Sequence, residues 1–283
     1  MRQKKFTSNG KTLHMAFLFL GLVALLIIGS FISKVVHVAK QGLFDGQHRL
    51  TILFESKPAE KGTLISFAPD KKTISILEIE GEAFDYKKLS VGLGIPIDGY
   101  VRLSAPIAKQ SDALQNGEIL SLLKKGLFGN DVLQTNVTPI DFVRLWLFTK
   151  SIPGYDMTEE KYRLASLSDE LVNTGLDKVV ALLFADKTLS EEKVSIHIIN
   201  ASGVTGLGNK LARLLTNSGG NVVAVSTGNA ILPRCEIGFI EEDTYTLEKI
   251  EKLLGCKTIQ MKKQTISDIV ITLGKDKANF FAL

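Results

Sequence analysis

A glycine-rich turn is the first segment of this sequence whose residue types could do chemistry. Asn200-Ala-Ser-Gly203-Val-Thr-Gly206-Leu-Gly208 follows an apolar run and opens an amphipathic one. A turn that leads from a strand into a helix can bind an anion, because the first N–H groups of the helix carry the positive end of its dipole. The residues that could contact a ligand there are Asn200, Ser202, Gly203, Thr205 and Gly206.

The spacing of these glycines departs from a nucleotide-binding motif. A dinucleotide site has the pattern G-x-G-x-x-G and an acid about 20 residues further on. Here the order is G-x-x-G-x-G, and the next apolar run ends at Val225-Ser226-Thr227 without an acid. We favour a tight strand-to-helix turn, in which Gly206 and Gly208 allow close packing of helix on sheet. A carbohydrate or anion contact and a nucleotide cofactor are the alternatives.

Cys235 and Cys256 are the two cysteines of the chain, and each begins an expected strand. They could form a disulfide in an oxidising exterior or stay as two buried thiols. Neither is spaced from a histidine as metal ligands or a nucleophile and its base would be. We therefore expect no metal site and no catalytic residue. The histidines, which form no H-x-x-x-H pair, are His14, His37, His48 and His197.

Glu78, Glu80 and Glu82 alternate along one apolar run and could converge on one face of a sheet. Paired carboxylates can carry out acid–base chemistry or hold a divalent cation. A solvated strand face has the same pattern, and we favour that interpretation.

Met15–Ser33 is a run of 19 residues without charge. As a helix it would be roughly 28 Å long, close to the ~30 Å hydrocarbon core of a bilayer. Basic residues precede it and no acid occurs before Asp45, so residues 1–14 should form a cytoplasmic tail and the chain after Lys34 should lie outside. A cleaved signal peptide and a buried soluble helix are the alternatives.

The basic tail accounts for the net charge of +4. Arg2, Lys4, Lys5 and Lys11 make up the surplus, so the rest of the chain is neutral. A neutral exterior part disfavours nucleic-acid binding, which needs basic residues to neutralise phosphates. The hydrophobic content of 45% allows a packed core and excludes wholesale disorder.

Residues 34–48 have the composition of a juxtamembrane connector, and residues 49–186 that of a mixed α/β domain. Apolar residues adopt helical spacing from about residue 111, with Thr138-Pro139 as N-cap and first-turn residue of one helix. The charged segment 187–193 is expected to be a linker. Strands are expected at 50–54, 63–67, 73–79 and 94–103, and a further helical stretch at 164–184.

Residues 194–283 have the pattern of a small domain with the element order β-α-β-β-α-β-β. Amphipathic runs predict helices at 205–217 and 244–254, which end at glycines. The fold class is therefore α/β (α+β), behind a single N-terminal transmembrane helix. Strands are expected at 194–199, 222–225, 235–240, 258–261 and 269–273.

The C-terminal domain resembles the C-terminal domain of LytR-type envelope proteins. The resemblance rests on VSIHIINASGVTGLGNKLARLL (194–215), GGNVVAVSTGNA (219–230) and SDIVITLGKD (267–276). It implies a place in the cell envelope more than a particular chemistry.

Residues 50–103 resemble the start of a LytR–CpsA–Psr (LCP) catalytic domain, through TLISFAPDKKTISILEI (63–79) and GIPIDGYVRLS (94–104). LCP enzymes transfer glycopolymers from polyprenyl-pyrophosphate to the cell wall, usually with a divalent metal. In that family acidic residues bind the metal and arginines hold the pyrophosphate.

The residues that the LCP family uses do not all occur here. Its Arg-Ser-Asp-Thr-like element would fall near Glu60-Lys61-Gly62-Thr63, which lacks the arginine and the aspartate. Its Pro-Arg-Asp element would fall near Glu80-Gly81-Glu82, which lacks the arginine. Lys57, Lys61 or Arg102 would have to replace the missing positive charge.

The resemblance implies a single-pass, extracytoplasmic envelope protein with a degenerate LCP-like domain. We expect a non-catalytic binding or scaffold module in cell-wall or glycopolymer assembly, without a cofactor. The expected partners are the lipid bilayer and cell-wall glycan or envelope proteins, not nucleic acid. The alternatives are a divergent LCP phosphotransferase that uses Mg²⁺, and a membrane-bound transcriptional regulator, for which only residues 1–14 would face the cytoplasm.

Overall fold

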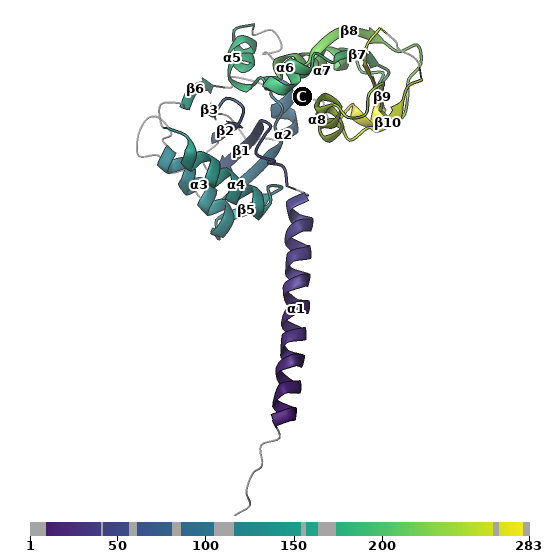
Figure 1. Cartoon of the computed structure of the whole chain (residues 1–283). Coiled ribbons are helices and arrows are strands. Elements are labelled where there is room, and N and C mark those ends of the chain that lie inside the picture. The colour runs from purple at the N-terminus through teal and green to yellow at the C-terminus, as the bar shows by residue number, and fades with distance from the viewer. Residues whose placement is uncertain are drawn as a thin grey trace, which may run out of the picture. The chain divides into compact units, whose positions relative to one another are not determined.

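The computed structural model describes residues 10–40, 42–56, 61–80, 86–104, 116–153, 157–163, 174–262 and 266–279. Contacts divide the chain into two compact units, residues 1–42 and 43–283. The first unit contains one long helix, and the second contains two mixed β-sheets with helices packed on them (Figure 1). The mixed α/β fold class predicted from the sequence is confirmed.

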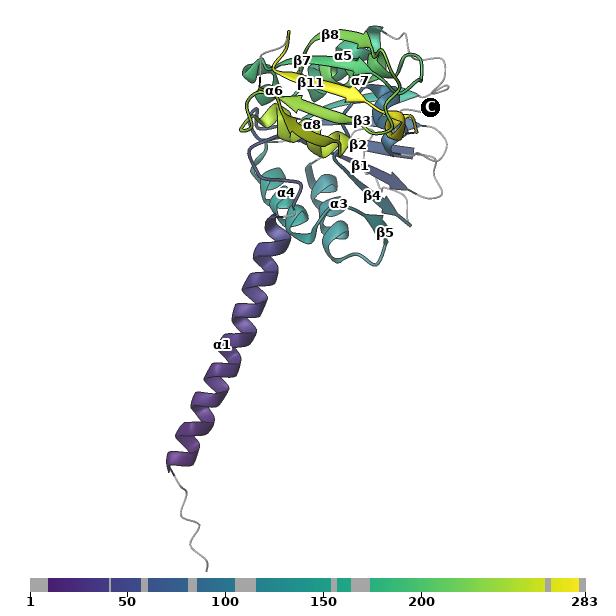
Figure 2. The same cartoon turned by 90° about the vertical axis from the view of Figure 1, so that its right-hand side faces the viewer.

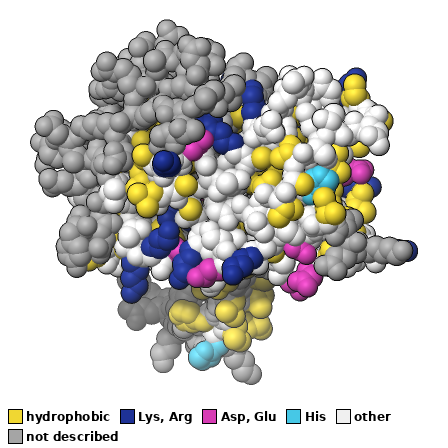
Figure 3. Space-filling model, turned by 90° about the horizontal axis from the view of Figure 1, so that it is seen from above, with side chains coloured by type: hydrophobic (Ala, Val, Ile, Leu, Met, Phe, Trp, Pro, Cys, Tyr) yellow, Lys and Arg dark blue, Asp and Glu magenta, His cyan; other side chains and the backbone are white. Residues whose placement is uncertain are grey.

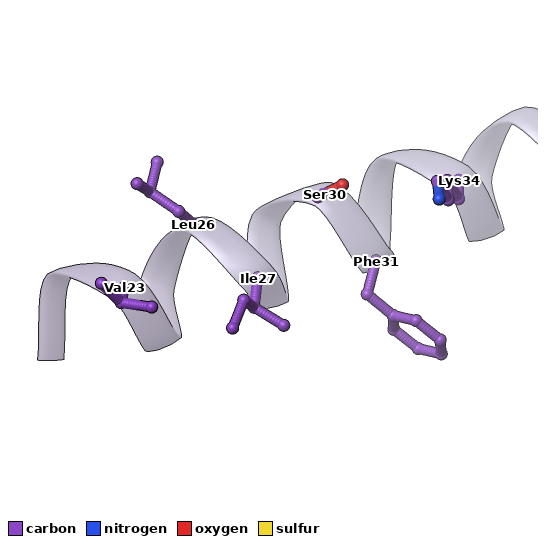
Figure 4. A pocket seen from close by; sticks show the side chains of 6 residues that line it. All are labelled: Val23, Leu26, Ile27, Ser30, Phe31 and Lys34. Carbon is purple, nitrogen blue, oxygen red and sulfur yellow. The ribbon is translucent and has the colours of Figure 1, made fainter. Parts of the chain in front are cut away.

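Helix α1 (Gly10–Lys40) forms the first unit and extends beyond the predicted run at both ends. Its apolar stretch, Phe17–Val38, is long and apolar enough to cross a membrane, and none of it is buried. A signal sequence near the N-terminus meets the same criteria of length and composition. Figure 4 shows side chains of α1 pointing away from the helix axis, so the groove they line is the surface of one helix; they are Val23, Leu26, Ile27, Ser30, Phe31 and Lys34.

Sheet A, in the first half of the second unit, has six strands. Its central strand β1 (Leu50–Ser56) pairs antiparallel with β2 (Lys61–Ala68) and parallel with β4 (Gly99–Leu103). Strand β3 (Thr73–Glu80) follows β2, and the two edges are β5 (Val132–Thr135) and β6 (Met157–Arg163).

Helices cover both faces of sheet A because its strands alternate two apolar sets. One set packs with α3 (Asn116–Phe128) and α4 (Pro139–Ser151), and the other with α2 (Tyr86–Leu93) and α5 (Thr174–Phe184). Ile52 and Phe54 belong to the first set, whereas Leu53 between them belongs to the second. This two-sided burial follows from the period of two along a strand.

The predicted N-cap of α4 is present and also ties the domain together. Thr138 caps the helix in a capping box with Asp141, and Pro139 occupies the first turn. Asp141 is fully buried, and its carboxylate also accepts hydrogen bonds from the backbone N–H groups of Leu43 and Phe44. The start of the second unit is therefore fixed to the cap of α4.

Sheet B has five strands in the order β10-β9-β11-β7-β8, with helices on one face (Figure 2). Its inward-facing residues form one core with α7 (Leu207–Asn217) and α8 (Tyr245–Leu254). The predicted order β-α-β-β-α-β-β is the order observed. The strands are β7 (Ser195–Asn200), β8 (Asn221–Thr227), β9 (Glu236–Phe239), β10 (Lys257–Gln260) and β11 (Ile269–Leu273), and a 3-10 turn follows at Lys275–Lys277.

The segment between the two sheets differs from the predicted linker. Residues Lys187–Glu192 form helix α6, which Asp186 caps by accepting hydrogen bonds from the N–H groups of Thr188 and Leu189. Charge alone suggested a linker, but an Asp N-cap and buried Leu189 are enough for a short packed helix. The domain boundaries at 49–186 and 194–283 stay a prediction, and residues 164–173 lie outside the described residues.

Candidate functional site

The glycine-rich turn uses its own polar side chains to hold its shape. The side-chain oxygen of Asn200 accepts hydrogen bonds from the N–H and the hydroxyl of Ser202, at 3.2 and 2.6 Å. The Asn200 amide donates to the carbonyl of Val204 at 2.8 Å, and the Ser202 hydroxyl accepts from the Val204 N–H at 3.0 Å. Two of the five candidate ligand residues therefore have a structural role in the turn.

The glycines of this turn serve two different purposes. Gly203 and Gly206 have φ angles of 80° and 81°, the left-handed region that favours glycine. A Cβ on Gly208 would lie 3.0 Å from Val225 Cγ1, so Gly208 allows α7 to approach the sheet. A Cβ on Gly206 would meet nothing within 4 Å. We expected packing at both Gly206 and Gly208, but at Gly206 the backbone angle is the reason for glycine.

The first two residues of α7, Leu207 and Gly208, are buried, whereas the residues just before them are partly exposed. Gly206 is the N-cap residue and provides no side-chain cap, and Thr205 before it is exposed. The five candidate residues thus lie together, with Thr205 as the exposed side chain beside the first N–H groups of the helix. Binding of a ligand at this turn stays a prediction.

Cys235 and Cys256 are joined by a disulfide, with their Cα atoms 5.2 Å apart. It connects the residue before β9 to the residue before β10. A disulfide was one of the two alternatives predicted for these cysteines. Cys235 is buried, and the 21-residue separation encloses helix α8. The bond therefore links the start of β9 to the start of β10 and closes a loop that contains β9 and α8.

Arg102, one of the three candidate substitutes for the arginines of the LCP family with Lys57 and Lys61, is already paired. Its Nε lies 2.7 Å from Glu55 Oε2, and its Nη1 lies 3.3 Å from the side-chain oxygen of Gln134. Glu55 and Arg102 are opposite one another on the parallel strands β1 and β4, and only 8% of Glu55 is exposed. A buried carboxylate holds its cation strongly, because separation would leave a charge without a partner. Lys57 lies outside the described residues.

The solvated strand face predicted for the β3 carboxylates is observed only in part. Glu78 and Glu80 are on the same face of β3, and Glu82 lies outside the described residues. Their strand positions are opposite Lys161 and Arg163 of β6, so the two strands pair acidic with basic positions. Among the described residues, no three His, Cys, Asp or Glu side chains gather as metal ligands.

Two polar contacts join the sheet A region to α7 and α8, and sequence reasoning missed them. Arg213 of α7 donates to the carboxylate of Asp177 at 2.8 Å and to the carbonyl of Gly92 at 2.9 Å. Lys249 of α8 lies 2.8 Å from the carboxylate of Asp98. No local pattern marks these residues, because each partner is distant in sequence.

Tyr245, the first residue of α8, makes a third contact of this kind. Its hydroxyl donates to Asp186 at 2.7 Å, and its ring stacks on that of His48 at a centroid distance of 3.9 Å. Burial, with the nearby carboxylate of Asp186, raises the pKa of the Tyr245 phenol far above its ordinary value. The phenol therefore stays a hydrogen-bond donor at any physiological pH.

Arg49 is a further buried charged residue, 5% exposed. Its guanidinium donates to the hydroxyl of Ser66 at 2.8 Å and to the carbonyl of Leu183 at 2.7 Å. Burial lowers the pKa of Arg49, and the surrounding carboxylates, Asp70 and Asp186 first, oppose that shift. The arginine ties β1 and β2 to the end of α5, so its role here is structural.

The part of the chain that contains sheet B matches a known protein family. Residues 193–276 match the family model of the LytR cell envelope-related transcriptional attenuator. The match confirms the predicted resemblance and contains β7 to β11 with both helices, so we refer to this part as the LytR-type domain. The comparison with curated proteins gives no match.

Two solved structures are similar to the chain. The Lin1025 protein from Listeria innocua is 10% identical, with a TM-score of 0.32, over 48% of this chain and 97% of that chain. TagT from B. subtilis is 15% identical, with a TM-score of 0.18, over 83% of this chain and 88% of that chain. The family model supports a domain of the LytR cell-envelope type at residues 193–276.

Proposed function

We propose that this protein is a membrane-anchored, extracytoplasmic module that binds or organises components during cell-wall or glycopolymer assembly, without catalysis. Helix α1 would be the anchor, and the two sheets would lie outside the cytoplasm. The partners would be the lipid bilayer and cell-wall glycan or envelope proteins, with no nucleic acid and no cofactor.

The placement outside the cytoplasm is supported by the disulfide. Disulfides persist in oxidising compartments and are rare in the cytosol. A Cys235–Cys256 bond in the LytR-type domain therefore fits an exterior location, as does the basic tail before α1. Reporter fusions at Phe44 and Leu283 test it, and activity of a cytoplasm-only reporter at either position would contradict the proposal.

The non-catalytic role rests on one observation, the pairing of Arg102 with Glu55. Transfer from a polyprenyl-pyrophosphate needs cations that are available to hold several phosphate charges. Among the three candidates for that task, Arg102 is the one whose side chain the structure describes, and its guanidinium is held by a buried carboxylate instead. Its charge is thus used within the protein.

A transfer assay tests this role directly. Full-length protein in detergent is given a polyprenyl-pyrophosphate-linked glycan, an acceptor glycan and Mg²⁺. We expect no transfer by the unchanged protein. Glu55→Ala releases Arg102 but should not restore transfer, because the arginines and the aspartate of the LCP elements are absent as well. The matched control, Glu248→Ala, releases Lys252 from an exposed pair on α8.

Two results of that assay would change the assignment. Transfer by the unchanged protein that is lost in Arg102→Ala would establish the divergent phosphotransferase, with Mg²⁺ as its metal. Transfer gained in Glu55→Ala alone would mean that the pair suppresses an intact site. A binding module also requires that the full-length protein co-sediments with isolated cell walls or captures an envelope protein, and failure of both would contradict it.

A further inference from the structure

The outer face of α4, on the side away from sheet A, is apolar. Phe142 and Leu145 belong to the core on the inner side and are buried. Val143 and Leu147, one turn apart on the outer side, are 42% and 56% exposed. A helix at a protein surface normally has polar residues on its outer side, whereas a helix that is apolar all round is covered by other apolar material.

The other residues of this face are types found at membrane surfaces. Trp146 shares the outer side with Val143 and Leu147, and Lys150 Nζ lies 5.2 Å from the centre of its ring. Tryptophan is enriched at the boundary of lipid and water, where lysine can bury its stem and keep its charge among the headgroups. The single acid of α4, Asp141, is fully buried. The face of the molecule in Figure 3 differs, because acidic and basic side chains both lie among its hydrophobic ones.

Phe128, the last residue of α3, adds a large apolar side chain at one end of this helix pair. Helices α3 and α4 lie side by side on sheet A (Figures 1 and 2). Gly126 of α3 lies against the ring of Phe142, so the end of α3 is beside the first turns of α4. Phe128 is 75% exposed there.

The same end of the helix pair is attached to α1 by a very short piece of chain. Helix α1 ends at Lys40, and two residues separate it from Leu43. The N–H groups of Leu43 and Phe44 are bound by Asp141 in the first turn of α4. Three steps of extended chain reach at most roughly 11 Å, and the headgroup layer of a bilayer is roughly 5–8 Å thick. When α1 crosses a bilayer, chain length alone therefore keeps the start of α4 at or near the headgroups.

We propose that the outer face of α4, together with Phe128, is a membrane-docking surface that lies on the bilayer crossed by α1. This inference rests on the proposed anchoring by α1 and adds a second contact with the same membrane. Val143, Trp146 and Leu147 would enter the boundary between headgroups and acyl chains, with Lys150 among the headgroups. The contact would hold the sheet A region in one orientation at the membrane.

The short connection explains how so small a face could bind lipid. Binding of an amphipathic helix to a bilayer scales with the apolar area that it buries, and α4 offers few side chains. Because α1 would keep α4 beside the bilayer, the contact would form within one molecule, at a high effective concentration. It should therefore be independent of protein concentration, whereas contact with a second copy should depend on it.

Fluorescence quenching of the full-length protein in phosphatidylcholine–phosphatidylglycerol vesicles tests the docking. Leu147→Cys is labelled with an environment-sensitive maleimide dye, and the native cysteines do not react because they form the disulfide. Leu182→Cys is the matched control, since Leu182 is 78% exposed on α5, which packs on the other face of sheet A. Lipid spin-labelled near the head of its acyl chains should lower emission roughly twofold at position 147 and leave it unchanged at position 182.

A charge on the docking surface should abolish the quenching. Val143→Glu, at an exposed position one turn before the dye, should return emission at position 147 to the level seen without spin label. Leu182→Glu, the matched charge on α5, should leave the quenching at position 147 in place. An unchanged melting temperature shows that each variant folds. Quenching at position 147 that survives Val143→Glu would overturn the proposal.

A dye on Ile27→Cys in α1 separates this inference from the proposed anchoring. Quenching at position 27 without quenching at position 147 would overturn the docking of α4 and leave the anchor intact. No quenching at position 27 would contradict the anchor and the docking together. Protection of position 147 from aqueous iodide that grows with protein density, without quenching by lipid, would identify a second copy as the occupant and also overturn the proposal.

Discussion

Sheet A and sheet B differ in how their faces are covered. Sheet A has helices on both faces, whereas sheet B has α7 and α8 on one, and the described residues on its other face are half-buried or exposed. Sheet A therefore buries charged groups, Arg49 and Glu55, and gives each an internal partner, although Arg49 Nε and Glu55 Oε1 have none. Sheet B has one core and a disulfide. A small one-sided domain gains more from a covalent link, because its core is limited.

The largest effect is expected when the Cys235–Cys256 disulfide is removed. Replacing both Cys235 and Cys256 by alanine opens a loop of 21 residues. Loops of this size predict a loss of about 3 kcal/mol in the free energy of unfolding, because the unfolded chain regains entropy. Denaturant titration measures the loss, and the unchanged protein under reducing conditions is the control.

The same titration also tests the boundary between the regions. If the LytR-type domain unfolds by itself, only one of two transitions moves. If both sheets unfold together, the single transition moves, as expected if Val91 of α2, which packs within the LytR-type core, joins the two regions. A loss below 1 kcal/mol in the free energy of unfolding, in either case, would contradict a stabilising role for the disulfide.

The sequence pattern was far more informative for sheet B than for sheet A. Helices predicted at 205–217 and 244–254 are observed at Leu207–Asn217 and Tyr245–Leu254. One-sided burial gives each element an apolar face that a single period reveals. The five strands were also found within two residues at each end.

In sheet A the elements at the margins were missed. β6 is an edge strand with the sequence MTEEKYR, whose apolar content is too low to indicate a strand. β5 has four residues, and α2 is short and contains Gly92 near its end. These elements exist because neighbouring elements provide pairing or packing, which no local window contains.

The candidate sites show the same limit. The glycine-rich turn was found because its residues are consecutive, although the use of Asn200 and Ser202 within the turn was not foreseen. The pair Glu55–Arg102 joins residues 47 apart, and Asp98–Lys249 joins residues 151 apart. Pairs at such separations depend on strand order and domain docking, so the sequence alone did not reveal them.

A glycine substitution in α3 tests the packing that covers sheet A. A Cβ on Gly126 would lie 2.3 Å from the ring of Phe142, which is buried in the core. Gly126→Ala should therefore cost about 1–3 kcal/mol of stability, by overpacking. Gly117→Ala in the same helix meets nothing within 4 Å and should stabilise by less than about 1 kcal/mol. Thermal unfolding compares the two, and equal signs would contradict the described packing.

The contact between the two regions should contribute less. Arg213→Ala removes the hydrogen bonds to Asp177 and Gly92 and should cost about 1–2 kcal/mol, since Asp177 is partly exposed. The control, Lys252→Ala, removes an exposed pair with Glu248 and should cost about 0.3–0.5 kcal/mol. A double-mutant cycle with Asp177→Ala isolates the coupling, and a coupling of zero would mean that this contact does not hold the regions together.

The smallest effect concerns acid stability at the junction of β7 and β11. Hydrogen bonds from the hydroxyl and the N–H of Ser195 lower the pKa of Asp268 below its ordinary value, and burial opposes this slightly. A carboxyl whose pKa is lower in the folded state stabilises the protein above its unfolded pKa of about 3.9, and this contribution is lost as the pH falls through the folded value. Between pH 6 and pH 3 the unchanged protein should therefore lose slightly more stability than Asp268→Asn, which does not titrate. Because Asp268 is only half-buried, the difference should be small, and urea titrations at several pH values are needed to resolve it. Ser195→Ala should reduce the same pH dependence while leaving Asp268 in place. Identical pH profiles for all three proteins would show that this carboxylate contributes nothing to the stability of sheet B.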